Sequence, residues 1–226
     1  MNTPGSLQWN LALIEEANEA SALFAHGLRI IKATTYDYDD ASPAMALLAL
    51  GAEKLLKLTI GMARLDRGEP WPSKNHMQRI RHRVVVADAQ ARAQLDLTRG
   101  TVPYHIQARR AAIEADPVIA AELNALDRFG DQGRFYFLDS LGDDPQVQPS
   151  PRSIWAGMVS SILAADVDLS AQMNTQDGWK AGRQVINQAV YRSLFDWWEF
   201  YRAVWMTGVL GTQAKEFSSA IRLLRH

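Results

Sequence analysis

Residues 42–68 read SPAMALLALGAEKLLKLTIGMARLDRG, in which apolar residues recur at intervals of three and four. That spacing places them on one face of an α-helix and does not fit the alternation of a strand. Ser42 and Pro43 form a helix-start signal, because serine caps the first amides and proline has no amide to leave unpaired. Gly68 is a typical residue to end a helix. The stretch therefore predicts a helix over residues 43–67.

The same helix signals recur on both sides of this stretch. Apolar residues at helical spacing predict a helix over residues 6–33, with acids early and bases late, as the helix dipole favours. Capping residues, prolines and glycines predict helices over residues 74–99, 103–115, 117–129, 134–141, 153–166 and 176–210, and a closing segment over 212–225. No stretch alternates as a strand does. We therefore expect an all-α, up-and-down bundle of about seven to eight helices, with two long helices near the start and one long aromatic helix near the C-terminus.

The composition fits one globular domain. The chain has 226 residues, of which 47% are hydrophobic and 22% charged, so it can bury a core and is not disordered. We expect a single all-α domain over residues 1–226. The segment GDDPQVQPSPR (residues 142–152) has three prolines and no periodicity. It either divides this domain into two parts or only crosses between helices.

Several classes of protein are excluded by what the sequence lacks. It has no cysteine, which removes disulfides, thiolate zinc sites and cysteine nucleophiles and fits a reducing compartment. It has no nucleotide-binding glycine loop, no HExxH motif and no GxSxG motif, so we expect no cofactor and no metal. The net charge of −1 argues against a globally basic nucleic-acid binder but allows a local basic patch. Without a signal peptide or an apolar run of about 20 residues, we expect a cytoplasmic protein that does not enter the membrane.

The acidic residues Asp37, Asp39 and Asp40 could bind a hard cation through their oxygens. They lack the glycine and the distal glutamate of a calcium loop. The favoured interpretation is therefore a loop that approaches the next helix.

The segment KNHMQRIRHRV (residues 74–84) contains six basic or titratable side chains and no acid. On one continuous helix, Arg79, His82 and Arg83 would be neighbours and would form a basic stripe. Such a stripe can hold phosphates by charge-assisted hydrogen bonds, and a histidine in it can move protons near neutral pH. His76, His82 and Arg79 are therefore the candidates for catalysis. The alternative is an ordinary solvated helix face.

Two other charged clusters allow both a structural and a functional interpretation. Glu53 and Lys57 lie one turn apart, which favours an ion pair on the helix, although Lys57 could instead project into an interhelical cleft. In DRFGDQGRFYFLD (residues 127–139) the charges alternate in sign around two glycines, which indicates ion pairs at a helix junction. Alternatively, Arg134 and the three aromatic residues that follow it line a pocket.

The sequence VYRSLFDWWEFYRAVWMTGVL (residues 190–210) is apolar on two helix faces. A helix of this kind is buried between layers of one chain or against a second subunit. Trp197, Trp198 and Trp205 are therefore expected in the core, with a homodimer interface as the alternative.

Residues 46–84 resemble the central hairpin of HEPN-type helical domains. Glu53, Lys54 and Lys57 match the glutamate–lysine pattern of its first helix, and His76 matches the histidine that opens the next. The resemblance covers about residues 20–95 and implies RNA binding or metal-independent RNA cleavage, in toxin–antitoxin or phage-defence settings and usually across a dimer interface. Catalytic members carry an Arg-x(4–6)-His motif on a helix. Arg99 and His105 have that spacing but straddle a predicted helix break, which implies a member without a complete nuclease motif.

The expected function is therefore that of a HEPN-like homodimer that associates with RNA or with a partner protein. The candidate ligand- or RNA-binding residues are Lys57, Arg79, His82, Arg83 and Arg134. The alternative is a non-enzymatic α-helical module for dimerisation or for binding a small ligand.

Overall fold

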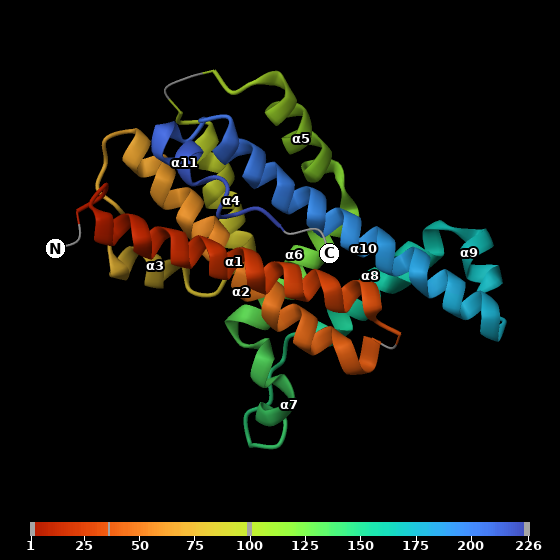
Figure 1. Ribbon diagram of the computed structural model, residues 1–226. Helices are drawn as coiled ribbons and strands as arrows, with labels where there is room; N and C mark the ends of the chain where they lie inside the picture. Colours follow the sequence, from red (N-terminus) through yellow and green to blue (C-terminus); the bar gives the residue numbers. More distant parts are fainter. Residues whose placement is uncertain (1–2, 36, 99–100, 224–226) are drawn as a thin grey trace.

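The computed structural model describes residues 3–35, 37–98 and 101–223, and for residues 37–39 the backbone alone. This described part of the chain is helical and has no strand, which confirms the all-α prediction (Figure 1). Its α-helices are α1 (Leu7–Ala33), α2 (Asp37–Asp66), α3 (Lys74–Ile80), α4 (Val84–Leu95), α5 (Tyr104–Ala115), α6 (Pro117–Asp131), α7 (Tyr136–Asp139), α8 (Pro151–Ala165), α9 (Val167–Gln172), α10 (Gln176–Met206) and α11 (Gly211–Phe217), with a 3-10 turn η1 (Gly133–Phe135) before α7. The predicted number of seven to eight was too low, because these ranges contain eleven α-helices.

Three long helices form the frame of the bundle, as the sequence predicts. The helices α1 and α2 run antiparallel and pack along their whole length, and α10 packs along α1 (Figure 1). The contact between α1 and α10 is aromatic. The ring of Phe24 lies 4.5 Å from that of Trp198 and 5.7 Å from that of Trp197, measured between centroids. Aromatic burial of this kind removes large apolar areas from water and stabilises the bundle.

The tryptophans of α10 belong to the core of this chain. Trp197, Trp198 and Trp205 are 0% exposed, because other helices cover α10 on every face that carries them. Their polar N–H groups are also satisfied internally, since Trp198 donates to the Ile221 carbonyl and Trp205 donates to Thr59 Oγ1. These three residues therefore do not form the surface of a dimer interface, and the core interpretation is the correct one.

The helix α2 begins at Asp37, six residues before the predicted start, and Pro43 lies inside it. Ala41, before the expected cap, and Ala44 and Met45, after it, are buried in the core. Burial of Ala41 favours a helix that starts before the local start signal of the serine–proline pair. Ser42 does not cap the helix and instead accepts a hydrogen bond from Arg152 (3.3 Å).

The predicted helix over residues 74–99 is divided into α3 and α4 by a sharp turn at Arg81–Arg83. Its expected N-cap is correct, since Ser73 Oγ accepts the amide of His76 at 3.2 Å. The division separates Arg79 from His82 and Arg83, so these side chains do not form the continuous helical stripe that the sequence predicts.

The proline-rich segment of residues 142–152 passes between helices that share one core. The helix α6 precedes this segment and packs against α8, which follows it. Ser150 caps α8 by accepting the amide of Ser153 at 3.0 Å. None of the described helices combines the length and the apolar character needed to cross a membrane.

Candidate functional site

A cleft of about 460 Å³ opens where the turn between α3 and α4 meets α2 and the end of α6. In this cleft the structure brings basic side chains together with a histidine that the sequence singles out. Four residues give it a positive character: Lys57 from α2, Lys74 from α3, and Arg81 and His82 from the turn. Met77, Gln78, Asp131 and Gln132 complete its lining. We refer to this site as the basic cleft.

The turn that forms one wall of the basic cleft depends on an unusual backbone at Arg81. Its φ of 55° and ψ of −142° belong to a region that glycine favours and that costs other residues about 1–3 kcal/mol. This conformation directs the Arg81 carbonyl to Lys57, whose Nζ donates to it at 3.0 Å. The helix α6 approaches the turn very closely, since a Cβ on Gly130 would lie 2.3 Å from the His82 carbonyl oxygen. Because glycine has no Cβ, α6 can lie this close to the turn. The helix continues through Gly130, where the sequence predicts a break.

Glu53 is buried and contacts two of the residues that line the basic cleft. Its Oε1 accepts from Lys57 Nζ at 2.6 Å, and its Oε2 lies 2.9 Å from His82 Nδ1. The predicted ion pair between Glu53 and Lys57 is therefore confirmed, and Lys57 also lines the cleft. A carboxylate on Nδ1 fixes the orientation of the imidazole ring and leaves Nε2 as the nitrogen that a ligand can reach. The His82 side chain is half exposed, so a ligand has access to it.

The other predicted site residues lie outside this lining. Arg79 is exposed on α3, and Arg83 turns towards Asp127, with Nε 3.6 Å from Oδ2. His76 lies at the start of α3, where its amide completes the cap. The guanidinium of Arg134 stands over the Phe135 ring at 5.4 Å. Of the five predicted ligand-binding residues, the structure thus brings only Lys57 and His82 together in the cleft.

Replacing Arg81 by glycine or by alanine distinguishes the effect of its backbone strain on stability from the effect of its charge. Both variants lose the guanidinium, but only glycine adopts a φ of 55° without strain. We expect Arg81→Gly to be more stable than Arg81→Ala by about 1 kcal/mol. The free energies of unfolding in urea measure this difference. Equal stabilities would show that the turn carries no backbone strain.

A buried acidic residue, Asp88, holds a polar network between α4 and α10 that the sequence analysis missed. Its Oδ1 accepts from Trp197 Nε1 at 2.9 Å and from the Tyr201 hydroxyl at 2.7 Å, and its Oδ2 accepts from Arg92. Burial raises the pKa of Tyr201 well above its usual range, and the Asp88 charge adds to this effect. Burial acts to lower the pKa of Arg92, but the charge and the hydrogen bond of Asp88, together with Tyr201 and Glu114, outweigh it and the pKa is raised. The signal was present, since Asp88 lies four residues after Val84 and three before Ala91, on the apolar face of its helix.

A second buried acid, Glu122, lacks the hydrogen bonds and the cationic partner that offset the burial of Asp88. It is 0% exposed on α6, and neither carboxyl oxygen has a hydrogen-bond partner among the described residues. Burial raises the pKa of Glu122 well above its usual value of 4.5, the nearby Ser193 hydroxyl opposes this, and the charge of Asp116 adds to it. Ser193 directs its own hydrogen bond to Asp116 at 2.9 Å. Glu122 interrupts an apolar stripe with Ile119 and Leu123, and that interruption is the signal that could have identified it.

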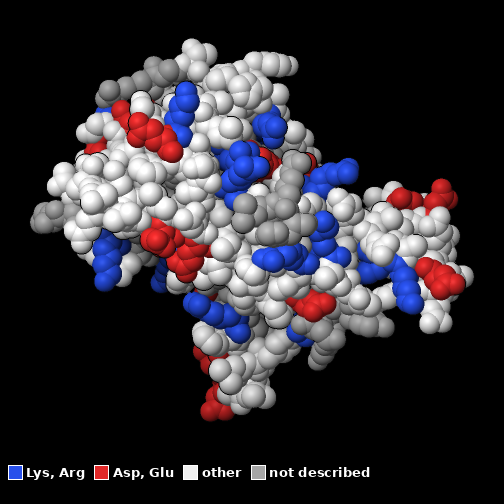
Figure 2. Space-filling view, viewed as in Figure 1, with Lys and Arg blue, Asp and Glu red and all other residues white. Residues whose placement is uncertain are grey.

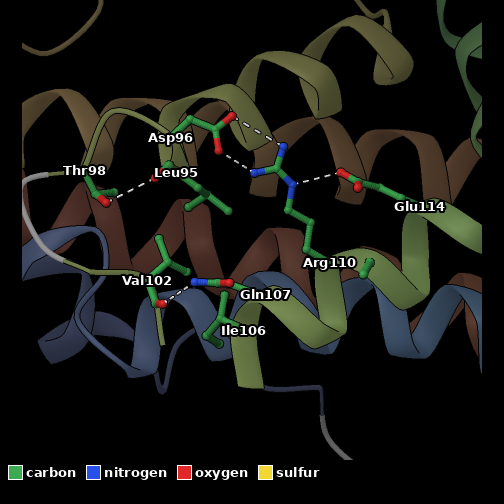
Figure 3. Close-up of a pocket in the computed structure, with 9 residues that line it drawn as sticks. Leu95, Asp96, Thr98, Val102, Ile106, Gln107, Arg110 and Glu114 are labelled. Carbon is green, nitrogen blue, oxygen red and sulfur yellow. Dashed lines mark hydrogen bonds and ion pairs between the residues drawn. The ribbon is translucent and has the colours of Figure 1, made fainter. Parts of the chain in front are cut away.

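A second pocket, of about 440 Å³, lies between the end of α4 and the start of α5 (Figure 3). Leu95, Val102 and Ile106 give it an apolar floor. Arg110 spans it, with NH1 2.6 Å from Asp96 and Nε 2.9 Å from Glu114 (Figure 3). The hydrogen bond to Asp96 is the main reason why the pKa of Arg110 is raised. Both sides of this guanidinium already contact carboxylates. The pocket therefore has fewer cationic donors for an anionic ligand than the basic cleft has.

The described residues contain no group of three histidine, aspartate or glutamate side chains that could hold a metal ion. The side chains of Asp37 and Asp39 lie outside the described residues, and so does Arg99. The predicted loop over Asp37, Asp39 and Asp40 is wrong, because the backbone of these residues belongs to the start of α2. Cation binding by these acids and the Arg99–His105 spacing stay predictions. No protein-family model, no curated protein and no solved structure matches this chain.

Proposed function

We propose that this chain is a HEPN-like, RNA-associated protein and that it binds an RNA phosphodiester in the basic cleft. The observation that carries the proposal is the meeting of Lys57, Arg81 and His82 in one cleft, although they come from α2 and from the turn after α3. Cationic nitrogen donors hold phosphate oxygens through charge-assisted hydrogen bonds. The resemblance of residues 46–84 to HEPN-type domains supports RNA as the source of that phosphate.

The hydrogen bonds within the cleft leave donors for a ligand. An ammonium group has three N–H donors, and Lys57 uses two of them on Glu53 and on the Arg81 carbonyl. The Arg81 guanidinium lies at the rim, with NH1 3.8 Å from Asp131 and most of its side chain exposed. A phosphate placed between Lys57 and Arg81 can therefore receive hydrogen bonds from both without the loss of an internal contact.

Removing two positive charges from the cleft tests this proposal. We expect Lys74→Gln/Arg81→Gln to bind single-stranded RNA at least about tenfold more weakly at low salt, because phosphate contacts supply most of such affinity. The logarithmic slope of affinity against salt is also expected to fall by about 1.4, or 0.7 for each lost contact. Retention of labelled RNA on a nitrocellulose filter across a salt series measures both quantities.

A matched double variant controls for the loss of net charge. Arg109→Gln/Lys215→Gln removes two exposed positive charges from α5 and α11, away from the cleft. We expect it to retain RNA nearly as well as the unmodified chain. An equal loss in both variants would mean that RNA binds through general charge, and no loss in either would remove the proposed site.

The hydrogen bond between Glu53 and His82 favours a second function, the cleavage of the bound RNA. His82 Nε2 would accept the proton of a 2′-hydroxyl as its oxygen attacks the adjacent phosphorus and the bond to the 5′-oxygen breaks. That leaving oxygen would take a proton from water. Lys57 and Arg81 would stabilise the charge on the phosphorane, and Glu53 would stabilise the imidazolium.

If this second function holds, His82→Asn is expected to slow cleavage by about 10²-fold or more and to leave RNA retention within a few-fold of normal. Glu53→Gln is expected to lower the rate less, because it keeps an acceptor for the imidazole N–H. The accumulation of fragments from end-labelled RNA gives these rates. Unmodified protein that leaves RNA intact over hours would limit the function to binding.

A further inference from the structure

The turn η1, the helix α7 and the segment after them form a lobe that projects from the bundle (Figure 1). We call residues 133–149 the projecting lobe. Gln146 holds it in shape, because its side chain contacts Asp139, Arg128 and the Gln132 carbonyl. Arg128 also donates to the Pro149 carbonyl at 2.9 Å, which ties the end of the lobe to α6. These bonds fix a defined surface on a segment that makes few contacts with the core.

The projecting lobe exposes apolar side chains to an unusual degree. Five of the thirteen exposed large hydrophobic residues in the described chain fall within residues 135–147, although this stretch is short. Leu141 is 85% exposed, and Val147 is fully exposed. Single exposed hydrophobic residues are ordinary, whereas several on one short projection, three of which line one depression, are typical of an interaction site. The five are Phe135, Phe137, Leu138, Leu141 and Val147.

The same lobe is acidic around its apolar surface. Residues 133–149 contain three aspartates and one arginine. Asp139, Asp143 and Asp144 line a depression of about 840 Å³ together with Phe135, Leu138 and Val147. Figure 2 shows the lobe as largely uncharged surface with acidic residues beside it. The lobe thus presents an apolar surface edged with carboxylates, and its charge is opposite in sign to that of the basic cleft.

We propose that the projecting lobe docks a basic, amphipathic segment of a partner protein. Apolar side chains of that segment would cover the exposed leucine, valine and phenylalanine surface, and its lysines or arginines would pair with the aspartates at the edge. RNA fits poorly here, because its phosphates carry the same sign of charge as the three aspartates. This docking does not depend on what the basic cleft binds.

A labelled synthetic peptide of about 14 residues, roughly four helical turns, with lysine and leucine at helical spacing, serves as the probe. Fluorescence anisotropy measures its binding to the full chain. We expect Leu141→Ser/Asp143→Asn to weaken binding about tenfold, since both residues are exposed and their replacement leaves the core unchanged. The control Val167→Ser/Asp168→Asn likewise replaces an exposed aliphatic residue and an exposed aspartate, here on α9, and is expected to bind as the unmodified chain does. Peptide analogues with glutamine for lysine, or with serine for leucine, are both expected to bind at least tenfold more weakly.

Several outcomes would overturn the proposal. Undiminished binding of the serine analogue would show attraction by charge alone, without an apolar docking surface. Equal weakening in both double variants would place the peptide away from the lobe. If the chain bound no peptide but self-associated in light scattering, and Leu141→Ser/Asp143→Asn abolished this, the occupant would be a second copy.

Discussion

Replacing Asp88 by alanine is expected to lower the free energy of unfolding by about 4 kcal/mol. The carboxylate is buried and accepts hydrogen bonds from Trp197, Tyr201 and Arg92. Its removal leaves the buried Trp197 indole N–H without its acceptor. The Tyr201 hydroxyl keeps only the Asp88 carbonyl at 3.4 Å, and the largely buried Arg92 guanidinium keeps only Glu114 at 3.6 Å. An unsatisfied neutral donor costs about 1–3 kcal/mol, and a buried charge without its partner costs more. Since domains of this size are stable by about 5–15 kcal/mol, the loss is a large part of the total.

Urea unfolding of two further variants separates this network from ordinary ion pairs. Asp96→Ala removes a carboxylate from Arg110, but that carboxylate is largely exposed, so we expect a change of about 1 kcal/mol or less. Asp88→Asn keeps one acceptor oxygen and loses the charge, and we expect an intermediate destabilisation. If Asp88→Ala and Asp96→Ala destabilised the chain equally, the buried network would contribute no more than a surface ion pair.

Replacing Glu122 by glutamine is expected to stabilise the chain, increasingly so as the pH rises. The unfolded chain ionises this carboxyl near its usual pKa of 4.5, whereas burial raises the pKa in the folded chain well above that value. At a pH between the pKa of Glu122 in the unfolded chain and its pKa in the folded chain, folding takes up a proton. A higher pH therefore disfavours the folded state. The cost grows by about 1.4 kcal/mol for each pH unit until the native carboxyl ionises. Glutamine does not ionise and removes this slope.

The measurement is the free energy of unfolding of the two proteins at several pH values from 5 to 8. The difference between them isolates Glu122, because all other titrating groups occur in both. Glu15→Gln on the exposed surface of α1 controls for the charge change and is expected to run parallel to the unmodified chain. A difference between Glu122→Gln and the unmodified chain that does not vary with pH would mean that Glu122 is ionised in the folded protein.

Helices with a strong apolar period and an unambiguous cap were predicted well. The start of α1 after Ser6 and the start of α6 after Asp116 follow from side chains that accept local amides. The early start of α2 was not predictable, because the sequence around Pro43 carries a local start signal. Only the packing of α2 in the folded chain shows that Ala41 is buried and that an additional helical turn is favourable.

The candidate site was predicted in part. The residue types of segment 74–84 indicated a basic site, and Lys57 and His82 do line one. The grouping was wrong, because it assumed that residues 79–83 continue a helix. The turn at Arg81 depends on two contacts with distant residues, the hydrogen bond from Lys57 and the close approach of Gly130. Neither contact leaves a trace in the local spacing of the segment.

The amino-acid sequence by itself determined that this protein is a bundle of helices and that its tryptophan-rich helix is central. Both follow from hydrophobic periodicity and capping, which act between residues only a few positions apart. The tertiary structure decided where Arg81 turns the chain, which basic residues meet at Glu53, and which acids are buried. These depend on the packing of α2, α6 and α10 against one another, and thus on side chains far apart in the sequence.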